Sequence, residues 1–179
     1  MDAEAIERFI EASALQHRHV CPRQVLGVRI GMAGAAGLGL DAPRKDKRLL
    51  VIVESDGCFV DGVSATTGCT VGHRTLRVED YGKVAATFVD VSSERALRVA
   101  PRGDVRQRAW EYAPGEKRRY DAQLQGYRRM PDELLLLVQE VALTTPVKTL
   151  ISRPGVRVNC AACGEEITNE REIVVNGNC

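Results

Sequence analysis

Apolar residues near the N-terminus recur with the spacing of an amphipathic helix. In residues 2–16, Ile6, Phe9 and Ile10 form one stripe, which predicts a helix packed against a core. A second helix is expected over residues 22–38, because this segment begins with proline, which is favoured at the first helical position. Glycines interrupt this segment and cost a helix about 1 kcal/mol each relative to alanine. They therefore predict close packing of the second helix against the sheet or a partner subunit.

A continuous apolar run at residues 49–53 predicts a strand buried on both faces. A short helix is expected to follow over residues 59–67. Further strands are expected where apolar or alternating segments are separated by turn-forming residues, over residues 76–78, 84–91 and 96–99. We expect these strands to form an antiparallel meander added to the first one, which gives a mixed sheet of about four or five strands.

Residues 102–142 are expected to be helical, with a last helix that starts at Pro131 and buries the apolar run over residues 134–141. Arginine and lysine are frequent in this region, which is one feature of nucleic-acid surfaces. Acidic residues are interspersed with them, however, and few aromatic residues are present that stack on bases. This pattern favours a solvated helical face, and nucleic acid is not expected as a partner.

The composition is that of an ordinary globular protein. The 179 residues are 44% hydrophobic and carry a formal net charge of +1, so one core with a small appendage is expected. We place the core domain at residues 1–145 and the appendage at residues 146–179. No apolar run approaches the roughly 20 residues that span a bilayer, and the N-terminus does not resemble a secretory signal. We expect a cytoplasmic protein whose cysteines are ligands or reactive thiols rather than disulfides.

Candidate chemistry is concentrated in a short segment that contains His17, His19 and Cys21. Cys21 precedes Pro22, so it is the expected N-cap of the second helix, where unpaired N–H groups stabilise a thiolate. Together with Cys58, these side chains form a donor set that suits zinc, nickel, copper or iron better than magnesium or calcium. The alternative is that both cysteines are small core residues and that the histidines are ordinary surface side chains.

Two carboxylates follow the first predicted strand. Glu54 lies where this strand ends, the usual place for function in layered α/β structures, and Asp61 lies in the first turn of the next helix. Either carboxylate is a candidate proton acceptor beside a metal that keeps an open position. Cys21, Glu54 and Asp61 are therefore the candidate catalytic residues.

The C-terminal segment contains a second group of cysteines. Cys160 and Cys163 flank a tight turn and are followed by Gly164, which fits a zinc knuckle. Cys179 adds a third ligand at a spacing typical of four-cysteine zinc sites. For the fourth ligand, either a downstream cysteine has been lost by truncation, or the terminal carboxylate, a histidine, water or a partner chain takes its place. The alternative interpretation is a redox Cys-x-x-Cys motif, although such a motif normally heads a helix behind a strand.

Short motifs recur along the expected core. They comprise His17, His19, Cys21-Pro22, Val53-Glu54, Cys58, Asp61, Thr67 to Thr70, Gly72, Asp80 to Lys83 and Ala86 to Phe88. Together they resemble the FmdE family, which takes its name from formylmethanofuran dehydrogenase, most closely over residues 5–100. The resemblance implies an α+β, thioredoxin-like core with a metal or thiol site, usually a homodimer, often followed by a small zinc domain of treble-clef-like fold. It also implies association with molybdenum or tungsten oxidoreductases.

The function that this resemblance favours is that of a metal-binding accessory protein. Such a protein would handle metal or sulfur at Cys21 and Cys58 for a molybdenum or tungsten oxidoreductase of C1 metabolism. An alternative is a metal-dependent enzyme that acts on a small C1 or pterin-like substrate at the same site. A further alternative is a zinc-finger transcriptional regulator whose tail contacts DNA or polymerase. The expected metals are zinc in the C-terminal site and zinc, nickel or iron in the core.

Overall fold

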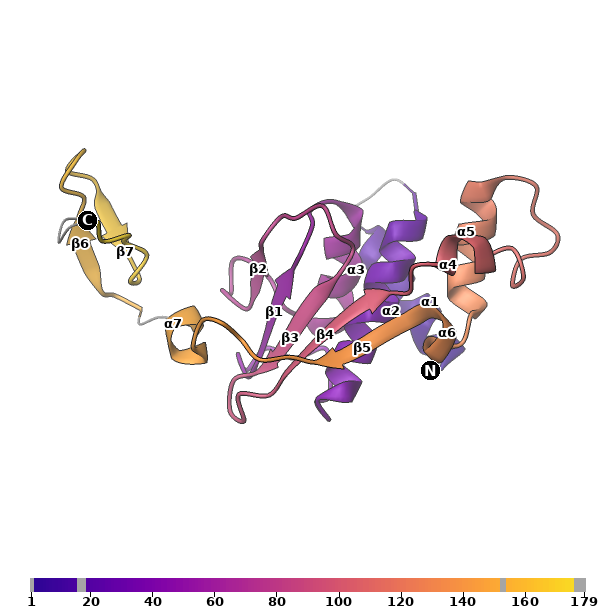
Figure 1. The fold of residues 1–179 in the computed structure, drawn as a ribbon, viewed down its shortest axis with the longest axis horizontal. Helices are drawn as coiled ribbons and strands as arrows, with labels where there is room; N and C mark the ends of the chain where they lie inside the picture. Colours follow the sequence, from indigo (N-terminus) through magenta and orange to yellow (C-terminus); the bar gives the residue numbers. More distant parts are fainter. Residues whose placement is uncertain (1, 16–18, 152–153, 176–179) are drawn as a thin grey trace. The chain divides into compact units, whose positions relative to one another are not determined.

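The computed structural model describes residues 2–15, 19–151 and 154–175. The chain forms two compact units, Met1–Ala142 and Leu143–Cys179. The first unit is an α+β structure in which a mixed five-stranded sheet is flanked by helices (Figure 1). This confirms the predicted mixed sheet. Within the described ranges, no helix is both long and apolar enough to cross a membrane.

The first two helices begin and end close to where their local signals predict. α1 spans Ala3–Ala14, and its N-cap Asp2 accepts a hydrogen bond from the backbone N–H of Glu4. α2 spans Pro22–Gly37 and has Cys21 as its N-cap. The predicted short helix is also present, as α3 over Cys58–Thr67. These elements are set by side chains at their own ends, so the sequence alone is sufficient to predict them.

The sheet has the strand order β2-β1-β3-β4-β5. Its central strand β1 is buried along its whole length, as predicted. β1 pairs in parallel with β2 and antiparallel with β3, and the remaining pairs are antiparallel. The prediction that β2 belongs to the antiparallel meander is therefore wrong, because α3 returns the chain for a parallel crossover. The strands are β1 (Leu49–Val53), β2 (Leu76–Val78), β3 (Ala86–Asp90), β4 (Ala96–Pro101) and β5 (Leu136–Glu140).

The prediction of a last helix that starts at Pro131 is wrong. Only one helical turn, α6 over Asp132–Leu135, follows Pro131, and the chain then continues as β5. β5 pairs with β4, with Val138 opposite Val99. This pairing satisfies backbone groups along β4 that a helix at the same place would leave without partners. The preceding region contains the short α4 (Val105–Arg108) and the longer α5 (Arg119–Arg129).

Glycines bring α2 and α3 into backbone contact. A Cβ atom added to Gly27 would lie 2.1 Å from the carbonyl oxygen of Phe59, and one added to Gly62 would lie 2.4 Å from that of Gln24. Residue 27 of α2 thus lies beside the start of α3, and Gly31 of α2 lies beside the later Thr66. The two helices therefore run parallel, with their N-termini at the same end. The predicted close packing of α2 involves α3 as well as the sheet.

The burial of Arg29 fixes α5 against α2. Arg29 is 2% exposed, and its guanidinium donates to the carbonyl oxygens of Tyr127 at 2.5 Å and of Met130 at 2.7 Å. These carbonyls lie at the C-terminal end of α5, where the last turn of a helix leaves acceptors unpaired. The contact positions the other end of α5, which carries a residue of the candidate site described below.

The second unit is small. It contains α7 (Val147–Ile151) and an antiparallel hairpin of β6 (Arg157–Asn159) and β7 (Glu166–Thr168). The turn of this hairpin carries Cys160, whose backbone N–H donates to the carbonyl of Glu165 at 2.8 Å. Gly164 has a φ of 75°, a conformation that glycine adopts without strain.

Candidate functional site

Two cysteines from separate segments meet where α2 and α3 begin. Cys21 caps α2: its Sγ accepts a hydrogen bond from the backbone N–H of Gln24 at 3.4 Å. In return, the Gln24 side-chain oxygen accepts from the backbone N–H of Cys21 at 2.8 Å. Cys58 is the first residue of α3, and its thiol is a hydrogen-bonding neighbour of Cys21. We refer to Cys21 and Cys58 as the thiol pair.

The environment of Cys21 contains opposing influences on its ionisation. Burial raises the pKa of the Cys21 thiol above its ordinary value, and the adjacent Cys58 raises it further. The backbone N–H of Gln24 opposes these effects, because a hydrogen bond to sulfur favours the thiolate. A cation bound between the two sulfurs would remove the penalty of placing two thiolates together. The thiol pair therefore has the donor chemistry of a site for a thiophilic ion.

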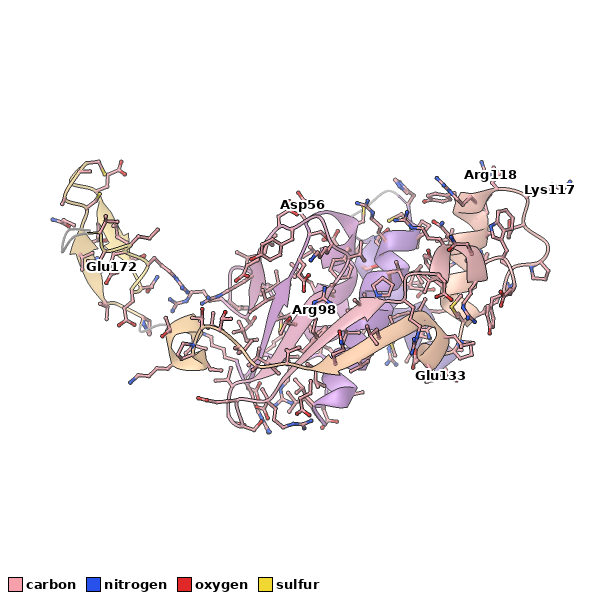
Figure 2. All side chains as sticks on the ribbon, viewed as in Figure 1. Asp56, Arg98, Lys117, Arg118, Glu133 and Glu172 are labelled. Carbon is pink, nitrogen blue, oxygen red and sulfur yellow. The ribbon has the colours of Figure 1, made fainter. Side chains whose placement is uncertain are left out.

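Tyr120, at the start of α5, adjoins the thiol pair. Its hydroxyl donates to the backbone carbonyl of Val20 at 3.1 Å and so holds the residue that precedes Cys21. Burial, followed by the charges of Cys21 and Cys58, raises the pKa of Tyr120. The phenol therefore lies close enough to sense both sulfurs. Figure 2 shows Lys117 and Arg118 in the segment that leads into α5.

Glu54 lies directly after β1 and is paired with Arg98. Arg98 donates from Nε to one carboxylate oxygen at 2.6 Å and from Nη2 to the other at 2.8 Å. The neighbours of Arg98 in β4, Leu97 and Val99, belong to the core beneath the helices. Since side chains alternate along a strand, Arg98 projects from the opposite face of the sheet (Figure 2). The structure does not bring the Glu54 carboxylate to the thiol pair.

Asp61 lines a cavity of about 410 Å³ between α1, α3 and the segment before β2. It lies three residues after Cys58 in α3, so both side chains share one face of that helix. The other polar residues of the cavity wall are Ser13, Ser64 and Thr70. Asp61 is therefore a carboxylate on the same side of the sheet as the thiol pair.

The predicted histidine ligands are only partly within view. His19 lies in an exposed bend just before Cys21. His17 and Cys179 lie outside the described residues, so their predicted roles stay predictions. Among the residues whose placement is described, no three or more His, Cys, Asp and Glu side chains are grouped so as to hold a metal ion. Cys69, by contrast, is 1% exposed, and its Sγ donates to the carbonyl of Leu49 at 3.4 Å.

In the second unit, Cys160 and Cys163 lie together in the turn between β6 and β7. The pKa of Cys160 is lowered, first by the backbone N–H groups of Cys163 and Ala162 and then by the Cys163 side chain. These contacts favour the thiolate, which is the form of cysteine that binds metal. The arrangement provides two sulfur donors at the turn of the hairpin.

A family model decides the relationship of this chain to known proteins. The model matches residues 16–137 and is described as FmdE, molybdenum formylmethanofuran dehydrogenase operon. The matched range covers more than half of the chain and includes the thiol pair and Tyr120. The chain belongs to the FmdE family. The resemblance noted from the sequence motifs is thereby confirmed.

This FmdE-family chain is also similar to a solved structure, that of an FmdE-like protein of tungsten formylmethanofuran dehydrogenase from Syntrophus aciditrophicus. The two share 20% sequence identity and a TM-score of 0.60, over 91% of this chain and 85% of that one. At this identity, the likeness concerns the fold alone.

Among curated proteins, the chain is 37% identical over 86 residues to a probable S-adenosyl-L-methionine-binding protein from Archaeoglobus fulgidus. The match covers 46% of this chain and 24% of that protein. The FmdE-family chain thus spans about a quarter of the length of this relative.

Sequence reasoning missed two residues of the site. Gln24 follows Cys21 by three positions, so the pair forms a capping box with cysteine in the place of serine or threonine. This local signal is visible in the sequence. Tyr120 is 100 residues away from Val20, the residue that it contacts, and no local pattern identifies such a partner.

Proposed function

We propose that this FmdE-family protein is an accessory protein that holds a thiophilic cargo, a metal ion or sulfur, at Cys21 and Cys58. The cargo would be passed to a molybdenum or tungsten formylmethanofuran dehydrogenase. The observation that carries the proposal is the meeting of two thiols at the N-termini of the parallel helices α2 and α3. Membership of a family that is described by a molybdenum formylmethanofuran dehydrogenase operon supports the proposed partner.

The two sulfurs have complementary properties for such a role. Cys21 is buried and is held by Gln24, so it provides a fixed donor. Cys58 is partly exposed, so it provides access from solvent. We propose His17 and His19 as further donors, because neutral imidazole suits the same borderline ions. Cargo capture by this set requires only donors and a path to solvent.

A cobalt titration tests the proposed capture. The full chain, stripped with a chelator and carrying C160S and C163S, is titrated with Co²⁺ while the sulfur-to-cobalt absorption is followed. We expect C21S and C58S each to weaken cobalt binding about tenfold or more, since each removes a donor. C69S is the matched control, because Cys69 is a buried thiol bonded to Leu49 and is not part of the pair. Equal cobalt affinity in C21S, C58S and C69S would contradict the proposal.

The cavity beside α3 favours a second candidate function, a metal-dependent enzyme that acts on a small C1 or pterin-like substrate. Asp61 lines this cavity and shares a helix face with Cys58, which suits a proton acceptor for a substrate held there. D61N tests this function, because it removes the acceptor and leaves the sulfur donors in place. Loss of turnover with unchanged cobalt affinity supports an enzyme, and absence of any turnover in the wild type rejects it.

We also propose that the second unit binds zinc through Cys160 and Cys163, with Cys179 as a third ligand. The lowered pKa of Cys160 supports this proposal, since the thiolate is the binding form. Elemental mass spectrometry on the purified chain measures the zinc content. We expect C160S to lose one equivalent of zinc and to leave unfolding of the first unit, followed by Trp110 fluorescence, unchanged. Retention of all zinc by C160S would contradict this assignment.

A further inference from the structure

The two members of the thiol pair differ in their access to solvent. Cys21 is 9% exposed, and its sulfur lies behind the first turn of α2. Cys58 has intermediate exposure, and the N-cap of α3, Gly57, has no side chain that covers the first turn. A reagent from solvent therefore reaches Cys58 before it reaches Cys21. Neither cysteine is in a disulfide.

The fold holds the two sulfurs beside each other in the reduced state. α2 and α3 are in backbone contact through Gly27 and Gly62, so their first turns cannot separate without breaking this packing. The hydroxyl of Tyr120 also fixes the carbonyl of Val20, directly before Cys21. The second thiol is thus already in position when the first one reacts.

We propose that Cys58 and Cys21 act as the attacking and resolving thiols of a dithiol that exchanges with small-molecule disulfides. In the first step, the Cys58 thiolate attacks one sulfur of the disulfide RSSR. The S–S bond breaks, one RS⁻ leaves and takes up a proton, and Cys58–S–SR forms. In the second step, the Cys21 thiolate attacks the Cys58 sulfur, a second RS⁻ leaves, and a Cys21–Cys58 disulfide forms. The pair loses two electrons and two protons, and RSSR is reduced to two RSH.

The exchange has a consequence for the cargo. Both sulfurs of the closed disulfide are joined to each other, so neither is available as a thiolate donor. Oxidation by a small-molecule disulfide would therefore expel a bound metal ion, and reduction would restore the site. This consequence rests on the proposed function, whereas the exchange itself does not.

Peptide mapping after exposure to oxidised glutathione tests the exchange. The chelator-stripped full chain is incubated with oxidised glutathione, quenched with acid, and alkylated under denaturing conditions. We expect the wild type to yield a peptide pair linked through Cys21 and Cys58. C21S is expected to accumulate glutathione on Cys58, and serine retains a capping oxygen for α2 in this variant. In C58S, residue Cys21 is expected to react about tenfold or more slowly than Cys58 does in C21S.

The outcomes separate this proposal from cargo capture. Cys69, which is buried and bonded to Leu49, should remain alkylated in every variant and serves as the internal control. A wild type without the Cys21–Cys58 linkage, or equal reaction rates in C21S and C58S, would overturn the exchange proposal and leave cobalt binding untouched. Normal exchange with no cobalt binding would overturn cargo capture alone.

Discussion

The contact between α2 and α3 leads to a quantitative prediction for Gly27→Ala. The added Cβ would lie 2.1 Å from the carbonyl oxygen of Phe59, whereas ordinary contact begins at 3.4 Å. The helices must therefore separate by about 1 Å near their N-termini. Overpacking of this kind costs about 1–3 kcal/mol, and the obstacle here is backbone, which cannot rotate away. Alanine regains about 1 kcal/mol of helix propensity. We expect a net loss of about 2 kcal/mol in the free energy of unfolding.

Urea unfolding followed by fluorescence measures this loss. Trp110 is the only tryptophan of the chain and lies in the first unit, so it reports on the unit that contains the packed helices. A loss of about 2 kcal/mol lowers the midpoint by about 1 M urea. Gly37→Ala is the matched control in the same helix, because its added Cβ meets only the flexible end of Leu97, at 2.7 Å. If Gly27→Ala is as stable as Gly37→Ala, then the close contact between α2 and α3 is not a determinant of stability.

Two further predictions concern groups that the structure holds by specific hydrogen bonds. The carboxylate of Asp90 accepts from Arg48 and from neighbouring serines, and these contacts hold its pKa far below the usual value. Its contribution to stability is thus present above the unfolded pKa of about 3.9 and declines below it, so the stability difference between wild type and D90N should shrink between pH 5 and pH 2; a constant difference would refute this. Tyr120→Phe removes the hydrogen bond before Cys21, worth about 1 kcal/mol, and should weaken cobalt binding about fivefold in the same titration. An unchanged affinity would exclude a positioning role for this hydroxyl.

Local signals were sufficient for the part of the fold that begins the candidate site. Asp2 and Pro22 mark the helix starts by their own side chains, and the prediction of Cys21 as an N-cap is confirmed because the cap depends on residues within one turn. The continuous apolar run of β1 likewise reports burial on both faces. These features need no knowledge of distant partners.

Non-local partners account for the elements that sequence reasoning misjudged. The leucine-rich run after Pro131 is compatible with a buried helix or a strand, and the unpaired edge of β4 selects the strand. The same edge lies more than thirty residues away in the sequence. Tyr120 reaches the thiol pair because Arg29 fixes the far end of α5. Contacts of this kind appear only after the chain has packed.

The sheet separates the two carboxylates that the sequence proposed as proton acceptors, and this separation yields a last prediction. Glu54 pairs with Arg98 on the face away from the helices, whereas Asp61 shares a face of α3 with Cys58. Glu54→Gln would weaken this partly buried ion pair, and we expect a loss of about 1 kcal/mol in the free energy of unfolding. Cobalt affinity and glutathione exchange should be unchanged, since both depend on the thiol pair. If Glu54→Gln impairs either one at full stability, then the two faces of the sheet act as one site, and the assignment of the chemistry to the helix side is wrong.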